Sequence, residues 1–195
     1  MPRTTTARAQ LIASATRLIH SSSYLAVSVD ELCADAGVRK GSFYYFFPSK
    51  RELALAAIDE QWTWTRANIL EPAFAPDVKP LERFERFFGL VAQHQQAAVV
   101  RGCPFGNLAA ELGTQDVVIR DRIRQVFDGY SVYFERALRD ASDAGLLSED
   151  VVSRTADALV AYFQGALLLA KTRNDATLIE DLAVQALHLV TGDKP

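Results

Sequence analysis

With 195 residues, 49% of them hydrophobic, the chain is long enough to bury the core of one or two compact domains. Its composition excludes a membrane-spanning protein, because no apolar run reaches the length of a bilayer span, and its two cysteines exclude a disulfide framework. The N-terminus lacks the apolar stretch of a secretory signal, so we expect a cytoplasmic protein.

The net charge of −3 taken alone argues against a nucleic-acid partner, but the charges are unevenly distributed. Residues 1–51 hold seven Lys and Arg against three Asp and Glu, a net +4, whereas residues 52–195 hold 14 against 21, a net −7. A basic segment joined to an acidic remainder concentrates the attraction for phosphate on one part of the chain. This distribution indicates that the N-terminal part binds nucleic acid.

The pattern of residues 1–50 predicts a helix-turn-helix preceded by one further helix. That first helix has its apolar residues at helical spacing, at Leu11, Ala15, Leu18 and Ile19. Ser28 and Glu31 form a capping box that should start a second helix at Val29. Gly37 then supplies the backbone freedom that a tight turn between two helices needs.

A third helix follows this turn and ends at Pro48, after which Ser49 and Glu52 form a second capping box. Phe43 and Phe47 lie four residues apart, so they share one face of the third helix and are expected to pack inward. Its other faces carry ammonium, hydroxyl and aromatic groups, at Lys40, Tyr44 and Tyr45. A helix that is apolar inside and rich in hydrogen-bond donors outside suits the major groove of DNA.

The segment DELCADAGVRKGSFYYFFPSK, residues 30–50, resembles the tetracycline-repressor (TetR) family of bacterial transcription regulators. The resemblance implies an all-α fold, with a three-helix helix-turn-helix DNA-binding head and a six-helix body for ligand binding and dimerisation. We expect the head to span residues 1–48 and the body residues 49–195. The resemblance also implies a homodimer that binds a palindromic operator in double-stranded DNA and is released by a small, largely apolar inducer.

The DNA contacts implied by this resemblance fall on matching positions of the motif. Lys40 and Tyr45 match base-reaching positions, and Gly41 lets the helix backbone approach the duplex. The phosphate-contacting positions are matched by Ser28, Ser42, Tyr44 and Lys50.

One position of the motif departs from the family. Phe46 stands where His or Tyr is common, and a phenyl ring cannot donate a hydrogen bond to phosphate. We expect Arg39, or Arg3 and Arg8 of the N-terminal arm, to compensate through the DNA backbone or the minor groove.

Proline and glycine divide the rest of the chain into six predicted helices. The fourth runs from Lys50 to about Leu70 and ends at Pro72, the fifth opens at Lys79-Pro80, and the sixth follows Pro104. The seventh runs from about Asp116 to Ala144, before Gly145. The eighth begins at Ser148, and the ninth runs from Asn174 or Asp175 to Gly192.

The eighth helix is apolar nearly all round in its second half, so it must be buried on two sides. In the family that the chain resembles, the last two long helices form a four-helix dimer interface. The implied interface residues are Val152, Ala156, Leu159, Phe163, Leu182, Ala186 and Leu189. The alternative is that the eighth helix is a central core helix of a monomer, because heptad spacing alone does not prove an interface.

The body is rich in aromatic residues, and the resemblance implies that its fourth to eighth helices surround an inducer cavity. The residues that we expect to line it are Trp62, Phe87, His94, Cys103, Asn107, Glu111, Tyr130, Phe134 and Gln164. The alternative is that they are ordinary core residues or that the polar ones face solvent.

Cys103 suggests a second mode of sensing. It precedes Pro104, a favoured first helical residue, and Arg101 is close in sequence, so a helix N-terminus and a positive charge would both stabilise a thiolate. Some family members sense electrophiles or oxidants through such a cysteine. The alternative is a small buried apolar residue, which we expect for Cys33.

A helical enzyme or ligand carrier without a DNA-binding role is the competing class of function. The chain contains no zinc-protease helix motif, no Walker loop and no nucleophile elbow. Its three histidines, His20, His94 and His188, are far apart, and none is paired with cysteine at metal-ligand spacing. We therefore expect no catalytic residue, no metal and no cofactor.

Overall fold

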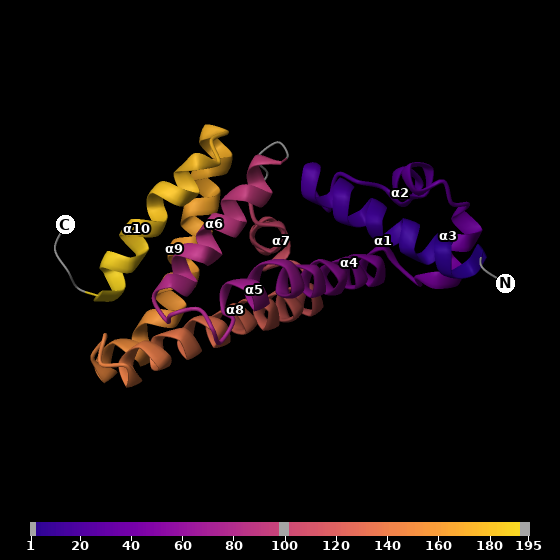
Figure 1. Ribbon diagram of the computed structural model, residues 1–195. Helices are drawn as coiled ribbons and strands as arrows, with labels where there is room; N and C mark the ends of the chain where they lie inside the picture. The colour runs from indigo at the N-terminus through magenta and orange to yellow at the C-terminus, as the bar shows by residue number, and fades with distance from the viewer. Residues whose placement is uncertain (1–2, 98–101, 192–195) are drawn as a thin grey trace. The chain divides into compact units, whose positions relative to one another are not determined.

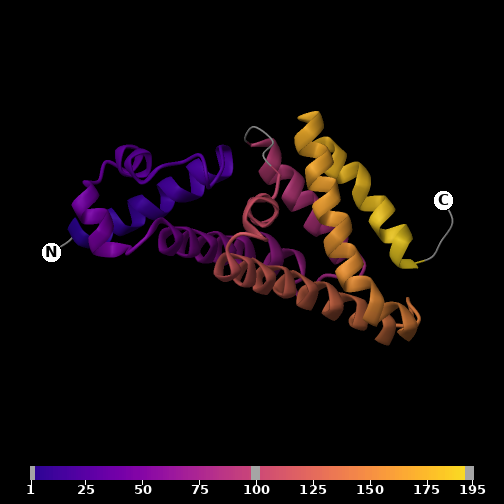
Figure 2. The same cartoon turned by 180° about the vertical axis from the view of Figure 1, so that it is seen from behind.

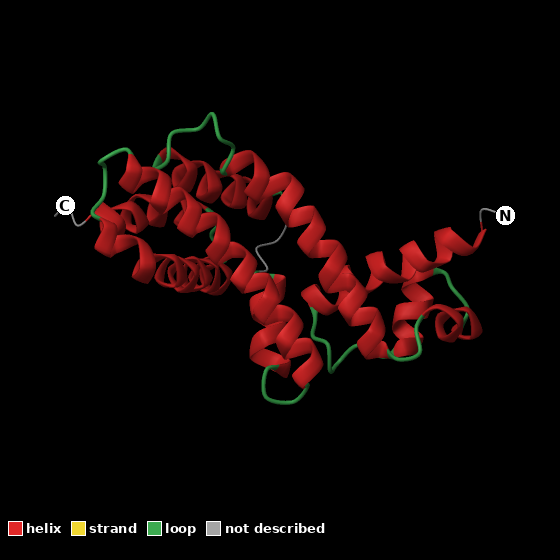
Figure 3. Cartoon of the chain, turned by 90° about the horizontal axis from the view of Figure 1, so that it is seen from below, coloured by secondary structure: helices red, strands yellow, loops and turns green. Residues whose placement is uncertain are grey.

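In the computed structural model, which describes residues 3–97 and 102–191, the chain is helical and these residues form no strand (Figure 3). The prediction of an all-α fold is confirmed. Packing divides the chain into two compact units. Unit 1 comprises Met1–Thr63 and Pro104–Arg124, and unit 2 comprises Trp64–Cys103 and Gln125–Pro195. The segment 104–124 therefore packs with the N-terminal helices, although it lies far beyond the boundary after Pro48 that the sequence suggested.

Unit 1 is built on the three N-terminal helices. These are α1 (Arg3–Ser21), α2 (Val29–Ala36) and α3 (Lys40–Phe46). Helix α1 packs against both α2 and α3 (Figure 1). Their shared core is formed by Leu11, Ala15, Leu32, Phe43 and Phe47, all of them buried. The remainder of unit 1 comes from α4 (Lys50–Thr65) up to Thr63, α7 (Pro104–Leu112), and the start of α8 (Val117–Asp143).

Helix α4 does not end at Pro72, where the sequence suggested a stop. It continues through a π-helical turn, η1 (Arg66–Leu70), into the short α5 (Glu71–Ala73), so the helical segment runs to Ala73. In the π turn the Glu71 amide donates to the Arg66 carbonyl, five residues back. Proline has no amide hydrogen, and its ring clashes with the carbonyl four residues earlier in an α-helix. The wider π turn directly before Pro72 accommodates this ring.

Unit 2 contains α6 (Glu82–Gln96), α9 (Glu149–Arg173), α10 (Thr177–Thr191) and most of α8. Helix α10 packs against α6 and against α9 (Figure 2). The core between these helices and α8 is aromatic, with Phe74, Phe84, Phe87, Tyr130, Phe134 and Phe163. Counting α4 to α5 as one segment, the described residues form the predicted three head helices and six body helices.

The helix ends in unit 2 follow the capping residues of the sequence, with small shifts. Ser148 is the N-cap of α9, as predicted, and Gly145 has a positive φ of 72° after α8. Helix α6 begins at Glu82, two residues after Pro80. Asn174 is the left-handed C-cap of α9 with a φ of 50°, and α10 begins at Thr177. The expected end of the last helix at Gly192 lies outside the described residues.

None of the helices within 3–97 and 102–191 is long and apolar enough to cross a membrane.

Two glycines offer a matched test of the turn between α2 and α3. Gly37 has a φ of 63°, and a Cβ added there would meet no atom within 4 Å, so only backbone strain opposes alanine. We expect Gly37→Ala to lower the free energy of unfolding by about 1–2 kcal/mol. Gly41 is equally uncrowded but lies within α3. Gly41→Ala should therefore raise the free energy of unfolding by up to about 1 kcal/mol, because alanine favours the helix. Urea unfolding of both variants measures the difference, and equal stabilities would contradict the left-handed turn.

Candidate nucleic-acid interface

The capping box predicted at the start of α2 is present in both directions. The Ser28 side-chain oxygen accepts the Glu31 amide hydrogen at 3.2 Å. The Glu31 carboxylate accepts the Ser28 amide at 2.7 Å and the Ser28 hydroxyl at 2.7 Å. These hydrogen bonds, the one from the Ser28 backbone first, hold the pKa of the Glu31 carboxyl below its usual value. Helix α2 therefore begins at Val29, as its sequence indicated.

The chain reverses after α2 at Gly37. The Gly37 amide donates to the Ala34 carbonyl at 3.2 Å, and the Val38 amide donates to the Cys33 carbonyl at 2.9 Å. Together with the left-handed backbone of Gly37, these bonds satisfy the last carbonyls of α2 and direct the chain into α3. The turn between α2 and α3 is thus formed by local hydrogen bonds.

Helix α3 has an apolar inner face and an open outer face. Phe43 is fully buried and Phe47 is 3% exposed, with their ring centroids 6.2 Å apart. On the outer face Tyr45 is 76% exposed and Tyr44 is 53% exposed. Because seven residues of helix make only two turns, the burial of the two phenylalanines determines which side chains point outward.

Lys40, the first residue of α3, lies at this outer face. Its ammonium is 2.7 Å from the Asp30 carboxylate of α2, and both side chains are largely exposed. The hydrogen bond to Asp30, and its negative charge, raise the pKa of Lys40. Exposed ion pairs contribute little to stability, so a DNA phosphate or base can replace Asp30 at small cost.

Lys50 occupies a different environment from Lys40. Its ammonium lies 4.3 Å from the centroid of the Tyr24 ring, and the side chain is partly buried. Partial burial lowers the pKa of Lys50, against the opposing effect of Glu111 and Glu31. Arg8 makes a similar contact, with its guanidinium carbon 5.4 Å from the centroid of the Phe47 ring. Both cations are thus held against aromatic rings of the head.

Glu111 of α7 binds the segment between α1 and α2. Its carboxylate accepts the Tyr24 amide at 2.9 Å and the Leu25 amide at 2.7 Å. The sequence suggests Glu111 for the inducer cavity, whereas the structure shows its carboxylate bound to backbone amides that lie 87 and 86 positions away in the sequence. No local sequence pattern predicts this contact. The loop amides need an acceptor, but the sequence does not show which distant carboxylate will supply it. Below, this is called the Glu111–loop contact.

The other predicted inducer residues are divided between the two units. Trp62 and Asn107 lie in unit 1, as Glu111 does. Six lie in unit 2, namely Phe87, His94, Cys103, Tyr130, Phe134 and Gln164. Phe87, Tyr130 and Phe134 are buried and their rings contact one another, with centroid separations of 5.2 to 6.4 Å. The structure thus brings these three together.

The polar members of the set in unit 2 differ in their surroundings. His94 lies against Trp64, with 4.5 Å between ring centroids, and burial lowers its pKa. Tyr130 is buried, which raises the pKa of its phenol well above the usual value. The Gln164 side-chain nitrogen is buried, and no hydrogen-bond partner for it exists among the described residues. Gln164 is therefore the member of the set that most needs a further polar atom.

Cys103 is buried directly before the first residue of α7, and Cys33 is buried in unit 1. Burial raises the pKa of the Cys33 thiol, in agreement with a packing role. Arg101, which the thiolate hypothesis for Cys103 requires, lies outside the described residues. Sensing through Cys103 stays a prediction.

Most residues predicted for the dimer interface are covered by their own subunit. The buried ones are Val152, Ala156, Leu159, Phe163 and Ala186. Leu182 is half-buried, and the side chain of Leu189 is outside the described part of the structure. The open side of α9 carries instead Ala158, Ala161, Gly165, Leu168 and Leu169, and α10 adds exposed Val184. The helix is thus buried on one side by its own core and apolar on the other, as its composition indicated.

Two family models match the chain. The model described as bacterial regulatory proteins of the tetR family matches residues 11–57, which include the helix-turn-helix. The model described as tetracyclin repressor-like C-terminal domain matches residues 80–187. The second match alone covers more than half of the chain.

Individual proteins agree with these matches. The transcriptional regulator AcuR of Cereibacter sphaeroides is 33% identical over 177 residues, 87% of this chain and 78% of its own length. The transcriptional repressor DhaR of a Mycobacterium species is 27% identical over 182 residues, 92% of this chain and 90% of its own length. The crystal structure of regulatory protein TetR from Rhodobacter sphaeroides superposes with a TM-score of 0.86 at 28% identity, covering 93% of this chain and 97% of that one.

The family is one of transcription regulators and not of enzymes, which removes the competing enzymatic class. The helix-turn-helix of α2 and α3, the aromatic helical body and both family matches lead to the same conclusion: this chain belongs to the TetR family of bacterial helix-turn-helix transcription regulators.

Proposed function

We propose that this regulator is a repressor that binds a palindromic operator as a homodimer and is released by a small, largely apolar inducer. The observation that carries the DNA-binding part is the outer face of α3, where Tyr44 and Tyr45 stand open beside Lys40 while Phe43 and Phe47 are buried. This face belongs to the segment with a net charge of +4, so phosphate attraction and base reading coincide. The name of the relative DhaR, a transcriptional repressor, supports repression.

The DNA contacts that we propose divide into two kinds. Lys40 and Tyr45 reach base edges, with Gly41 allowing the close approach of the backbone, since no atom lies within 4 Å of its absent Cβ. The phosphate contacts come from Ser28, Arg39, Ser42, Tyr44 and Lys50. Arg8 supplements them in place of the hydroxyl or imidazole that Phe46 lacks.

The inducer site that we propose lies in the aromatic body. Phe87, Tyr130 and Phe134 supply apolar surface, and the buried side-chain nitrogen of Gln164, which has no hydrogen-bond partner among the described residues, supplies a donor. A pocket of apolar walls with few polar groups selects a small, largely apolar molecule that carries one acceptor.

The coupling that we propose runs along α4. This helix begins at Lys50, shortly after the end of α3 at Phe46, and contains Trp62 before it continues into unit 2. An inducer changes operator affinity only if it binds one arrangement of the heads better than another. Typical coupling free energies correspond to changes of about 5- to 150-fold, and the operator must weaken inducer binding by the same factor.

A gel shift with the promoter region beside the protein's own gene tests the proposal. Retardation that survives excess unrelated DNA supports operator binding. Equal retardation of all DNA fragments, or of none, would contradict operator binding.

Lys40 provides the first prediction about specificity. Lys40→Ala should weaken operator binding about 5- to 150-fold and relax base preference, because a base-edge contact is lost. Lys79→Ala is the matched control, since Lys79 also forms an exposed ion pair, with Glu82 at 2.7 Å in unit 2. Titrations of both variants with operator and mutated operators measure the effect, and equal affinities would exclude Lys40 from base reading.

Lys50 should behave differently from Lys40. Lys50→Ala should weaken binding to all sequences alike and reduce the slope of log affinity against log salt concentration by about one unit, since one phosphate contact is lost. The measurement is a salt titration on operator and on random DNA. A loss confined to the operator would assign Lys50 to base recognition.

The dimer is predicted to form through the open side of α9 and α10. Leu168→Glu with Val184→Glu places charge on side chains that are 60% and 52% exposed in the single chain, so folding is preserved while the interface is lost. Val132→Glu, at a side chain 64% exposed on α8, is the control. Sedimentation should show monomer for the double variant and dimer for the control. If both variants sediment as dimers, the interface does not involve this side of α9 and α10.

A further inference from the structure

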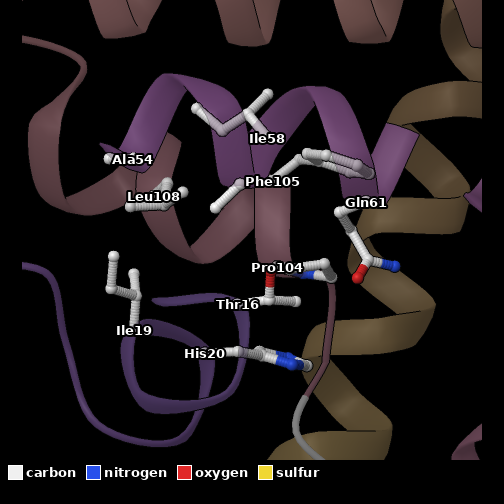
Figure 4. Close-up of a pocket in the computed structure, with 10 residues that line it drawn as sticks. Thr16, Ile19, His20, Ala54, Ile58, Gln61, Pro104, Phe105 and Leu108 are labelled. Carbon is white, nitrogen blue, oxygen red and sulfur yellow. The ribbon is translucent and has the colours of Figure 1, made fainter. Parts of the chain in front are cut away.

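We propose that unit 1 contains a second small-molecule site, which binds a small, uncharged and largely apolar molecule between α1, α4 and α7. The apolar part of its lining includes Ile19, Ala54, Ala57, Phe105 and Leu108 (Figure 4). Each of these residues belongs to the unit that carries the helix-turn-helix, and none is among those proposed for the inducer. We call it the α1–α4–α7 pocket.

The lining determines the class of ligand. Most of it is aliphatic or aromatic, and no Asp, Glu, Lys or Arg is present to balance an ionic group. The polar side chains are Thr16, His20 and Gln61, and Figure 4 shows His20 and Gln61 lying toward the side of Pro104, away from Ile19 and Ala54. A molecule with an apolar body and one hydrogen-bonding group matches this division.

The size of the pocket makes its occupation conditional. Its free volume is about 30 Å³, enough for about two water-sized groups but not for an aromatic ring. A ring-sized ligand therefore requires α1 to separate from α4 and α7. Such a ligand binds the opened arrangement better than the present one, which is the condition for a ligand to shift an equilibrium.

The Glu111–loop contact opposes this opening. On α7, Glu111 follows Leu108 of the pocket by three residues, so both lie on one side of the helix. The amides that it binds belong to Tyr24 and Leu25, in the segment that continues from α1. Lys50, at the start of α4, lies over the Tyr24 ring. Opening the pocket would therefore strain the contacts of Glu111 and Lys50 with the segment at Tyr24, which leads to the Ser28 cap of α2.

Occupation of the pocket is thereby transmitted to the helix-turn-helix without passing through unit 2. This effect on DNA rests on the proposed operator binding, whereas binding of the ligand to the pocket does not. The two can be measured separately.

The chain contains a reporter for the pocket. It has two tryptophans, and Trp62 contacts the lining residue Phe105 with 6.4 Å between ring centroids. Trp64→Phe leaves Trp62 as the only tryptophan. The emission of Trp62 in this full-length background then reports on changes at Phe105.

The experiment titrates this protein with benzyl alcohol as the probe. We expect a saturable change in Trp62 emission. Ala57→Leu, which fills the pocket, should weaken probe binding at least tenfold, whereas Ala56→Leu, half-buried on the same helix and outside the lining, should leave it unchanged. Glu111→Gln replaces the charged acceptor of the Glu111–loop contact with a neutral one. This variant should bind the probe severalfold more tightly, because the pocket then opens more easily.

Equal probe binding by Ala57→Leu and Ala56→Leu, or no saturable response of the folded protein, would overturn the site. Circular dichroism shows whether each variant is folded. If Ala57→Leu does not fold, Ala57→Val replaces it, and an intermediate loss of probe affinity is expected. Saturating probe should also lower the affinity for the promoter fragment, and unchanged affinity would overturn the regulatory role. If the promoter is never bound while the probe still distinguishes the two variants, the proposed repressor function fails and the pocket stands.

Discussion

The burial of Phe43 and Phe47 is the constraint on which the DNA-binding part of this protein depends. A helix of seven residues has too few backbone hydrogen bonds to be stable alone, so its orientation comes from packing. With both rings in the core beside Leu11 and Leu32, Tyr44 and Tyr45 must face outward. The side chains that we propose to contact DNA are therefore positioned by two residues that are themselves buried in the core.

The second organising feature is that α7, distant in sequence, packs within the DNA-binding unit. Its carboxylate at Glu111 satisfies two amides between α1 and α2, and its apolar side completes the α1–α4–α7 pocket. The unit that holds the helix-turn-helix is consequently larger than the head of three helices. The proposed pocket would give regulation a route to the head through α7, in addition to the proposed route along α4.

The candidate site was predictable to the extent that its chemistry is local. The capping box of Ser28 and Glu31, the turn at Gly37 and the two faces of α3 all follow from spacings of a few residues, and the structure agrees with each. The residues of α9 that we propose for the dimer interface were less predictable, because a helix that is apolar all round does not reveal which side its own core covers. Packing against the aromatic core buries Phe163 and leaves Leu168 open.

By itself, then, the sequence determined the all-α class, the helix-turn-helix and most helix ends, because caps, turns and periodicity act between neighbours. Only the tertiary structure decided that α4 continues past Pro72 through a π turn, that Glu111 binds the segment after α1, and that the pocket lies in unit 1. Those features depend on contacts between residues tens of positions apart. Which distant groups meet is set by the packing of whole helices, and no local pattern records it.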